Sequence, residues 1–374
     1  MSRVAAQSTA DMGASSAPHV LIMAGGTGGH VFPALAVAHA LIERGARVSW
    51  LGTKAGIEAR LVPANDLALH TIDVAGLRGK GTLSWLIAPL KLVRACLQAL
   101  GLVRQLAPQL VVGMGGFAAG PGGLAARLTG RPLLIHEQNA SAGLTNRLLS
   151  RLATTVLQAF PNTFAAQRAA KTVGNPVRRE ILELAAPADR WQTREGRVRL
   201  LVLGGSGGAL AINERVPAAL ATLAEDERPQ VRHQAGRTLR EATTAYAKYD
   251  VSADVSEFID DMAAAYAWAD VVVCRSGALT VAELAAAGVG ALLVPYPFAA
   301  DDHQRANGEY LVAAGAASLI NQDELTVERL AAELRTLCAD RAALLGRAEA
   351  ARAVAWPRAT DDIVDACFST LEAA

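Results

Sequence analysis

Short apolar runs alternate with longer amphipathic stretches along most of this chain. In the first half the runs with strand character are HVLIMAG, RVSWLG, LVVGMGG, RPLLIHE and TTVLQAF, separated by helical stretches such as FPALAVAHALIERG and LTNRLLSRLA. Because this alternation is typical of βαβ units, it predicts an α/β fold with a parallel sheet covered by helices.

The rhythm begins again after VGNPVR, with VRLLVLGG, QVRHQAG, VSEFI, ADVVVCRSG and GALLVPYP. The segments LIMAGGTGGHVFPALAVAHAL and LLVLGGSGGALAINERVPAAL both predict a strand, a glycine turn and a helix, 179 residues apart. At 374 residues the chain is long enough for two cores. We therefore predict two Rossmann-like domains, residues 19–177 and 178–356, divided where the Asn175-Pro176 step disfavours a continuous helix.

The two ends of the chain differ from these domains. Residues 1–18 are rich in Ala and Ser, lack the apolar core of a signal peptide, and are expected to form a disordered extension. Residues 357–374 have the pattern of an amphipathic helix, which we expect to pack back on the N-terminal domain. Uncharged stretches are broken by Pro and Gly, so no transmembrane helix is expected.

The formal net charge of +1 hides an asymmetry between the halves. Residues 1–177 carry a net charge of +10, and residues 178–374 a net charge of −9. A basic half suits an anionic partner such as a phospholipid surface or a diphosphate. Nucleic acid is disfavoured because Lys and Arg are dispersed and aromatic residues make up only 5% of the chain. The four cysteines have no metal-ligand or redox spacing, which indicates a reducing, cytoplasmic compartment.

The glycine turns are candidate anion sites, because a helix N-terminus offers free amides and partial positive charge. The first comprises Thr27, Gly28 and Gly29, and the second includes Ser206. A third glycine loop, GMGGFAAGPGG, covers residues 113–123. Neither turn completes the G-x-G-x-x-G pattern, and the second strands do not end in an acid, so a dinucleotide is disfavoured. The alternative is that these glycines only permit tight turns.

Nine motifs in order along the chain resemble the MurG family of cell-wall glycosyltransferases. They are GGTGGHVFPALAVA, GLRGKG, VGMGGFAAGPG, IHEQNASAGLTNRLL, VGNPVR, LGGSGGA, FIDDM, CRSGALTVAEL and DDHQRAN. The resemblance covers residue 19 to the C-terminus and implies a GT-B fold. It further implies inverting transfer of GlcNAc from UDP-GlcNAc to the C4 hydroxyl of a lipid-linked muramoyl-pentapeptide acceptor, at the cytoplasmic face of the inner membrane. This reaction belongs to peptidoglycan synthesis and so bears on cell shape and division, with other cell-wall synthesis proteins as possible partners.

The resemblance also implies a donor site in the second domain. Glu283 would bind the ribose hydroxyls, the backbone at Ile259 would contact the uracil edge, and Gln304 and Asn139 would bind the donor sugar. The remaining nucleotide contacts are implied for Ala278, Leu279, Thr280, Val281 and Ala282. His303 stands where many relatives have a second glutamine. On sequence alone, a solvated helical Glu283 is the alternative.

Departing UDP carries negative charge that must be stabilised. The chain contains no Asp-x-Asp pair, so we expect no metal and no cofactor. Amides of the second turn, the Ser206 hydroxyl and the Arg178 guanidinium are predicted to bind the diphosphate. The alternative for Arg178 is a surface cation at the domain boundary.

His30 is the predicted catalytic base. It follows the first glycine turn at a helix N-terminus, where the helix dipole favours the neutral imidazole that a base requires. A helix-capping or phosphate-binding role is the alternative. Glu137, at the end of a predicted strand, is the second candidate base.

A basic and apolar segment follows residue 76 and is a candidate membrane-docking site. The predicted docking residues are Leu77, Arg78, Lys80, Leu83, Trp85, Leu86 and Lys91. An ordinary core helix with solvated cations is the alternative. Two other functions remain open: a UDP-GlcNAc 2-epimerase or glycolipid synthase on the same fold, and a non-enzymatic scaffold that senses nucleotide sugars.

Overall fold

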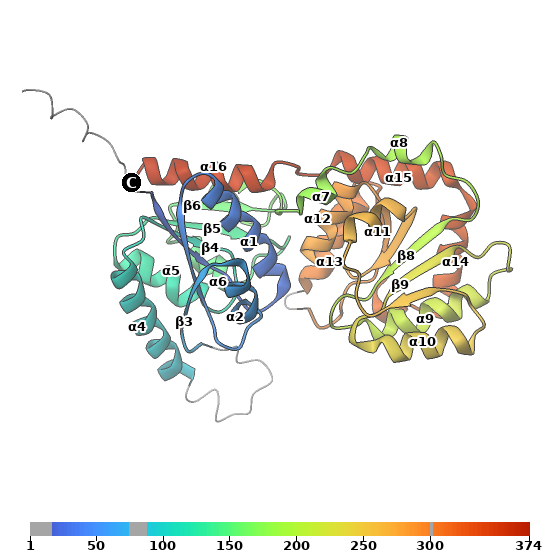
Figure 1. The fold of residues 1–374 in the computed structure, drawn as a ribbon, viewed down its shortest axis with the longest axis horizontal. Coiled ribbons are helices and arrows are strands. Elements are labelled where there is room, and N and C mark those ends of the chain that lie inside the picture. The colour runs from blue at the N-terminus through green and yellow to red at the C-terminus, as the bar shows by residue number, and fades with distance from the viewer. Residues whose placement is uncertain (1–16, 75–87, 300–301) are drawn as a thin grey trace, which may run out of the picture.

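The computed structural model describes residues 17–74, 88–299 and 302–374. They form two α/β domains that lie side by side, with the last helix crossing back over the first domain (Figure 1). Each domain contains one wholly parallel sheet, as the alternation of strand and helix patterns predicts.

Within the described residues, the first sheet has seven strands in the order β3-β2-β1-β4-β5-β6-β7. They are β1 (His19–Met23), β2 (Arg47–Gly52), β3 (Ala68–Thr71), β4 (Leu110–Gly113), β5 (Leu133–Glu137), β6 (Thr155–Gln158) and β7 (Lys171–Thr172). All five strands predicted in this half are present. β3 and β7, which were not predicted, are the two edges of the sheet.

The helices of the first domain pack on this sheet. They are α1 (Gly28–Glu43), α2 (Glu58–Leu61), α4 (Ala88–Leu106), α5 (Ala119–Leu128) and α6 (Leu144–Leu149). The last helix of the chain, α16 (Ala359–Glu372), packs against α1 (Figure 1). Its Ile363, Val364 and Cys367 are buried in the core of the first domain, and Asp365 pairs with Arg44. The C-terminal helix is therefore part of the first domain's core.

The second sheet repeats the arrangement in the order β10-β9-β8-β11-β12-β13. Its strands are β8 (Arg199–Leu203), β9 (Gln230–Gln234), β10 (Asp254–Ser256), β11 (Val271–Cys274), β12 (Gly290–Leu293) and β13 (Ala317–Leu319). Its helices are α7 (Arg179–Leu182), α8 (Pro187–Trp191), α9 (Leu210–Ala221), α10 (Leu239–Lys248), α11 (Met262–Trp268), α12 (Ala278–Ala287), α13 (His303–Ala313), α14 (Val327–Ala339) and α15 (Arg341–Ala353). The strand order reverses beside β1 in one sheet and beside β8 in the other, so the two glycine turns occupy equivalent positions.

The chain crosses between the domains after β7 and again after α15, and the two crossings are packed together. Gly174 has φ +79°, and a Cβ there would lie 2.1 Å from Cβ of Trp356. Asn175 donates from Nδ2 to the carbonyl of Gln138 at 2.9 Å. Because Gly174 has no side chain, the first crossing can lie directly against the second.

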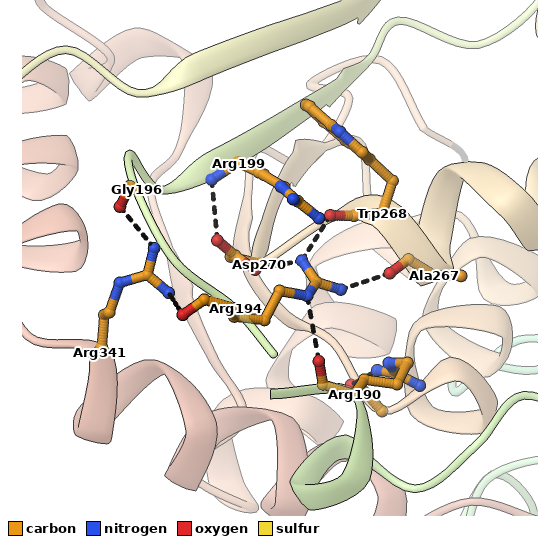
Figure 2. Close-up of polar contacts among 9 residues, drawn as sticks. Arg190, Arg194, Gly196, Arg199, Ala267, Trp268, Asp270 and Arg341 are labelled. Atoms are coloured by element: carbon orange, nitrogen blue, oxygen red, sulfur yellow. Dashed lines mark hydrogen bonds and ion pairs between the residues drawn. The ribbon is translucent and has the colours of Figure 1, made fainter. Parts of the chain in front are cut away.

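A buried ion pair lies beside the start of β8, the first strand of the second sheet (Figure 2). The Arg194 guanidinium pairs with Asp270, and the other Asp270 oxygen accepts from the backbone nitrogen of Arg199 at 2.9 Å. Arg194 also donates to the carbonyl oxygens of Ala267 and Trp268. The cluster joins the segment before β8 to the end of α11.

Replacing Asp270 with alanine is expected to lower the free energy of unfolding by about 3–5 kcal/mol, because it leaves the Arg194 charge buried without a partner. Urea unfolding followed by circular dichroism measures this. Glu309→Ala is the control, since it removes an exposed pair with Arg305 and should cost about 1 kcal/mol or less. Equal losses in the two variants would contradict a stabilising role for the buried pair.

Candidate active site

The first glycine turn lies at the carboxyl end of β1, next to the reversal of strand order in the first sheet. Parallel sheets with this topology bind ligands at that position. α1 begins directly after the turn and contacts α12 of the second domain. The turn is therefore placed near the region where the domains meet.

His30 lies in the first turn of α1 and packs on the third glycine loop. Its backbone nitrogen donates to the carbonyl of Thr27 at 3.1 Å, and its Nδ1 lies 3.4 Å from the Thr27 hydroxyl. Gly115, with φ +92°, lies beneath the ring, and a Cβ there would come within 2.5 Å of the imidazole. Glycine at position 115 thus makes room for His30.

Burial lowers the pKa of His30 below the ordinary value of 6.5, because desolvation disfavours the imidazolium. The negative charges of Glu137 and Glu58 act in the opposite direction, and His303 adds to the lowering of the pKa. The direction is the one inferred from the helix dipole, but burial is the main cause. The ring is therefore neutral at pH 7 and able to accept a proton.

Glu58 lies beneath the first glycine turn, and no role was predicted for it from the sequence. Its fully buried carboxylate accepts from the backbone nitrogens of Gly26 at 2.9 Å and Thr53 at 3.0 Å, and from the Thr53 hydroxyl at 2.7 Å. A Cβ on Gly25 would lie 2.5 Å, and one on Gly56 2.0 Å, from this carboxylate. The signal in the sequence is the pair of glycines in GTKAGIE, Gly52 at the end of β2 and Gly56, which leave room for one buried acid.

Glu137 ends β5 and organises the loop that follows. Oε1 accepts from the backbone and side-chain nitrogens of Asn139 at 2.9 and 3.2 Å, and Oε2 accepts from Gly143 N at 3.2 Å and Asn146 Nδ2 at 2.9 Å. The side chain is buried, and four donors already engage its oxygens. This arrangement suits a carboxylate that shapes the loop and adds negative charge near His30.

Asn139 connects the two domains through Asn307 of α13. Asn307 is fully buried, and its Nδ2 donates to Asn139 Oδ1 at 3.2 Å. Its Oδ1 accepts from Ala140 N at 2.7 Å, and its Nδ2 also reaches the Ser276 carbonyl at 3.3 Å. Asn307 belongs to the DDHQRAN motif, but its place at the domain contact could not be predicted from that motif.

The second glycine turn follows β8 and is held from β9. Gly205 N donates to Gln234 Oε1 at 2.9 Å, and Gln234 Nε2 donates to the Glu257 carbonyl at 2.8 Å. Ser206 lies exposed at the tip of the turn. Gln234, which sequence reasoning missed, therefore joins the turn to the segment that leads into Ile259.

Glu283 and Arg178, predicted for different parts of the donor, form one cluster with Tyr266. Arg178 Nη2 donates to Glu283 Oε1 at 3.0 Å, and the Tyr266 hydroxyl donates to Glu283 Oε2 at 3.1 Å. Burial raises the pKa of Glu283, while Arg178 and both hydrogen bonds oppose that rise. Glu283 is thus a buried, partnered carboxylate and not a solvated helical residue.

The other predicted donor residues lie around α12. The helix begins at Ala278, so its first turn contains Leu279 and Thr280, with Val281 and Ala282 following. Ile259 is half-buried against the core cluster that includes α12. Gln304, near the start of α13, accepts at Oε1 from the backbone nitrogen of Tyr296 at 2.9 Å.

The predicted docking segment is described only in part. Leu77, Arg78, Lys80, Leu83, Trp85 and Leu86 lie outside the described residues. Lys91 lies exposed on α4 beside Leu90, Val93 and Leu97, whose side chains are 72%, 57% and 64% exposed.

Across the described ranges, none of the helices is both long and apolar enough to span a bilayer. Within the same ranges, no three His, Cys, Asp or Glu side chains group as metal ligands.

Comparison with known proteins identifies the family. The family 28 glycosyltransferase models match residues 20–158 (N-terminal domain) and 199–363 (C-terminal domain). The chain is 58% identical, over 93% of its length and 98% of the relative, to the UDP-N-acetylglucosamine–N-acetylmuramyl-(pentapeptide) pyrophosphoryl-undecaprenol N-acetylglucosamine transferase of Alkalilimnicola ehrlichii. It superposes on Acinetobacter baumannii MurG with a TM-score of 0.84 and 44% identity, covering 94% and 99% of the two chains. The chain belongs to the MurG family. Its fold is therefore GT-B, as the motifs implied.

A structure of UDP-N-acetylglucosamine 2-epimerase also superposes on this MurG-family chain. The TM-score is 0.63 at 15% identity, with 96% and 98% of the two chains covered. At this identity the likeness concerns the fold alone.

Proposed function

We propose that this chain transfers GlcNAc from UDP-GlcNAc, with inversion, to the C4 hydroxyl of MurNAc in the pentapeptide-diphospho-undecaprenol acceptor. The product is the disaccharide lipid used in peptidoglycan synthesis. The observation that carries the proposal is the 58% identity, over almost the full length of both chains, to a transferase named for this reaction.

His30 is the proposed base. The acceptor oxygen bonds to C1 of GlcNAc, its proton passes to the neutral imidazole, and the bond from C1 to the diphosphate breaks with its electrons leaving on UDP. Supporting this assignment, burial favours the neutral ring, whereas the Glu137 oxygens already accept four hydrogen bonds. Thr27, Gly28 and Gly29 would lie beside the acceptor diphosphate and the donor sugar.

The donor is proposed to bind mainly to the second domain. Amides of the second turn, Ser206 and the Arg178 guanidinium would stabilise the charge that develops on UDP. Glu283 would accept from the ribose hydroxyls, and the backbone at Ile259 would contact the uracil edge. Asn139 and Gln304 would bind hydroxyls of GlcNAc.

A transfer assay tests the function. Radiolabelled UDP-GlcNAc is incubated with the muramoyl-pentapeptide lipid, with and without chelator, and the organic phase is counted. We expect the label to appear in the lipid, with one UDP released for each GlcNAc transferred. UDP release should depend on the acceptor. Conversion of UDP-GlcNAc to its 2-epimer without acceptor would support the epimerase alternative, and binding without turnover would support the scaffold.

We further propose that the protein docks on the cytoplasmic face of the inner membrane, where it would meet its lipid substrate and other cell-wall synthesis proteins. The exposed apolar side chains of α4 beside Lys91 and Arg94, and the +10 charge of residues 1–177, support this.

Replacing Leu90 and Leu97 together with serine is expected to lower binding to vesicles containing anionic phospholipid by about tenfold or more, since each exposed leucine contributes about 1.5 kcal/mol or more when buried. Co-sedimentation at fixed salt measures this. Leu210→Ser, at an exposed leucine of the second domain, is the matched control and should bind as the wild type does. Unchanged binding of the double variant would remove α4 from the docking surface.

A further inference from the structure

The hydroxyl of Tyr266 is directed at the carboxylate proposed to recognise ribose. Tyr266 is fully buried and donates to Glu283 Oε2 at 3.1 Å, while Arg178 donates to Oε1 at 3.0 Å. The Arg178 side chain is 51% exposed and that of Glu283 only 9%. Tyr266 is therefore the anchor of the carboxylate on its buried side, and Arg178 its partner toward solvent.

The number of accepting positions on Glu283 fits a ribose. An ionised carboxylate has about four lone-pair positions, two on each oxygen. Arg178 uses one position on Oε1, and Tyr266 uses one on Oε2. Among the residues that the structure describes, no other donor bonds to this carboxylate, so one position on each oxygen is left, which matches two neighbouring hydroxyl donors. With Tyr266 on one oxygen and Arg178 on the other, the plane of the carboxylate is fixed before a ligand arrives.

Tyr266 lies on an element that is already part of the proposed donor site. It belongs to α11, which packs against α12, the helix that carries Glu283. α11 begins at Met262, three residues after Ile259. Burial raises the pKa of Tyr266 well above its ordinary value of 10, so the phenol keeps its proton and donates at every working pH.

We infer that Tyr266 is a positioning residue for ribose recognition, which holds Glu283 so that the site selects a ribonucleotide over its deoxy analogue. The inference rests on the proposed donor role of Glu283. Tyr266 itself does not touch the nucleotide. It acts by fixing the direction of the two free accepting positions of the carboxylate.

The test compares UDP with 2′,3′-dideoxy-UDP as ligands of wild type and Tyr266→Phe, using calorimetry. Phenylalanine keeps the ring and removes only the hydroxyl. Without the Tyr266 hydroxyl the Glu283 carboxylate is no longer fixed toward the ribose hydroxyls, whose hydrogen bonds to a charged group are worth about 1.5–3 kcal/mol, so we expect the Kd of UDP to rise about tenfold or more. The Kd of dideoxy-UDP should change by less than about twofold, since that ligand makes no use of Glu283.

Tyr246→Phe is the matched control. Tyr246 is also a buried tyrosine of the second domain, and its hydroxyl lies 3.0 Å from His233 Nδ1. This variant should keep the wild-type ratio of the two dissociation constants. If Tyr266→Phe keeps the wild-type ratio of the two dissociation constants, whether or not both ligands bind more weakly, the inference is overturned.

The variant Glu283→Gln tests the proposed ribose-binding role of Glu283 separately from the role of Tyr266. If wild type distinguishes the two ligands and Glu283→Gln does not, the ribose role of Glu283 stands and Tyr266→Phe decides the inference. If Glu283→Gln keeps the full wild-type discrimination, the donor role of Glu283 fails, and the role of Tyr266 fails with it.

Discussion

The variant His30→Ala is expected to lower kcat by about two to four orders of magnitude, because it removes the group that takes the acceptor proton. Binding of UDP should stay close to the wild-type value, since the proposed nucleotide contacts lie in the second domain. In wild type, kcat/KM should fall on the acid side with a midpoint below 6.5, because the pKa of His30 is lowered and only the neutral ring accepts a proton. Initial rates across pH measure both effects.

His39→Ala is the control on the same helix. Its imidazole is bonded to Asn65 at 3.1 Å, on the surface of the first domain, and its loss should leave kcat unchanged. Near-normal turnover in His30→Ala would remove His30 from the role of base. Glu137 would then be the group to replace next.

The second large effect is expected from Glu283→Ala. The change removes the proposed ribose acceptor and leaves Arg178 and the buried Tyr266 hydroxyl without their partner. We expect the Kd of UDP to rise by roughly one to two orders of magnitude, as befits hydrogen bonds to a charged group. Equilibrium binding of UDP and the KM of UDP-GlcNAc measure this.

Two controls make the Glu283 result interpretable. Urea unfolding shows whether the second domain remains folded, and Glu324→Ala removes an exposed carboxylate of the same domain, paired with Arg329. Glu324→Ala should bind UDP as the wild type does. Unchanged UDP binding in a folded Glu283→Ala protein would count against the proposed donor site.

Most of the fold could be predicted because its central strands are long apolar runs. β1 and β8 are buried along almost their whole length, and each leads into a glycine turn and a helix. The strands that were missed are edges. β3 reads ALHT and is partly exposed, β7 has two residues, and β13 has three. An edge strand this short is defined by the neighbour it pairs with, and a local pattern carries little of that information.

The site was predictable where a motif marks it and not where the three-dimensional contact decides the role. His30, Glu137 and Glu283 lie in recognisable motifs, and the structure gives each a defined set of partners. Gln234 and Tyr266 were missed because their partners lie 17 to 29 residues away in the chain. Glu58 was missed because its carboxylate joins Thr53, 5 residues away, to Gly26, 32 residues away. Nothing in the local sequence distinguishes Gln234 and Tyr266 from ordinary strand or helix residues, and the only local signal for Glu58 is the small residues around it.

The path of α16 affects how the chain folds during synthesis. Its apolar face fills part of the core around α1, yet in the sequence it follows the whole C-terminal domain. Domains generally fold as units in the order of their synthesis. Here the N-terminal domain stays incomplete until α16 has been synthesised, so a nascent chain exposes the apolar surface of α1 while the C-terminal domain is already able to form.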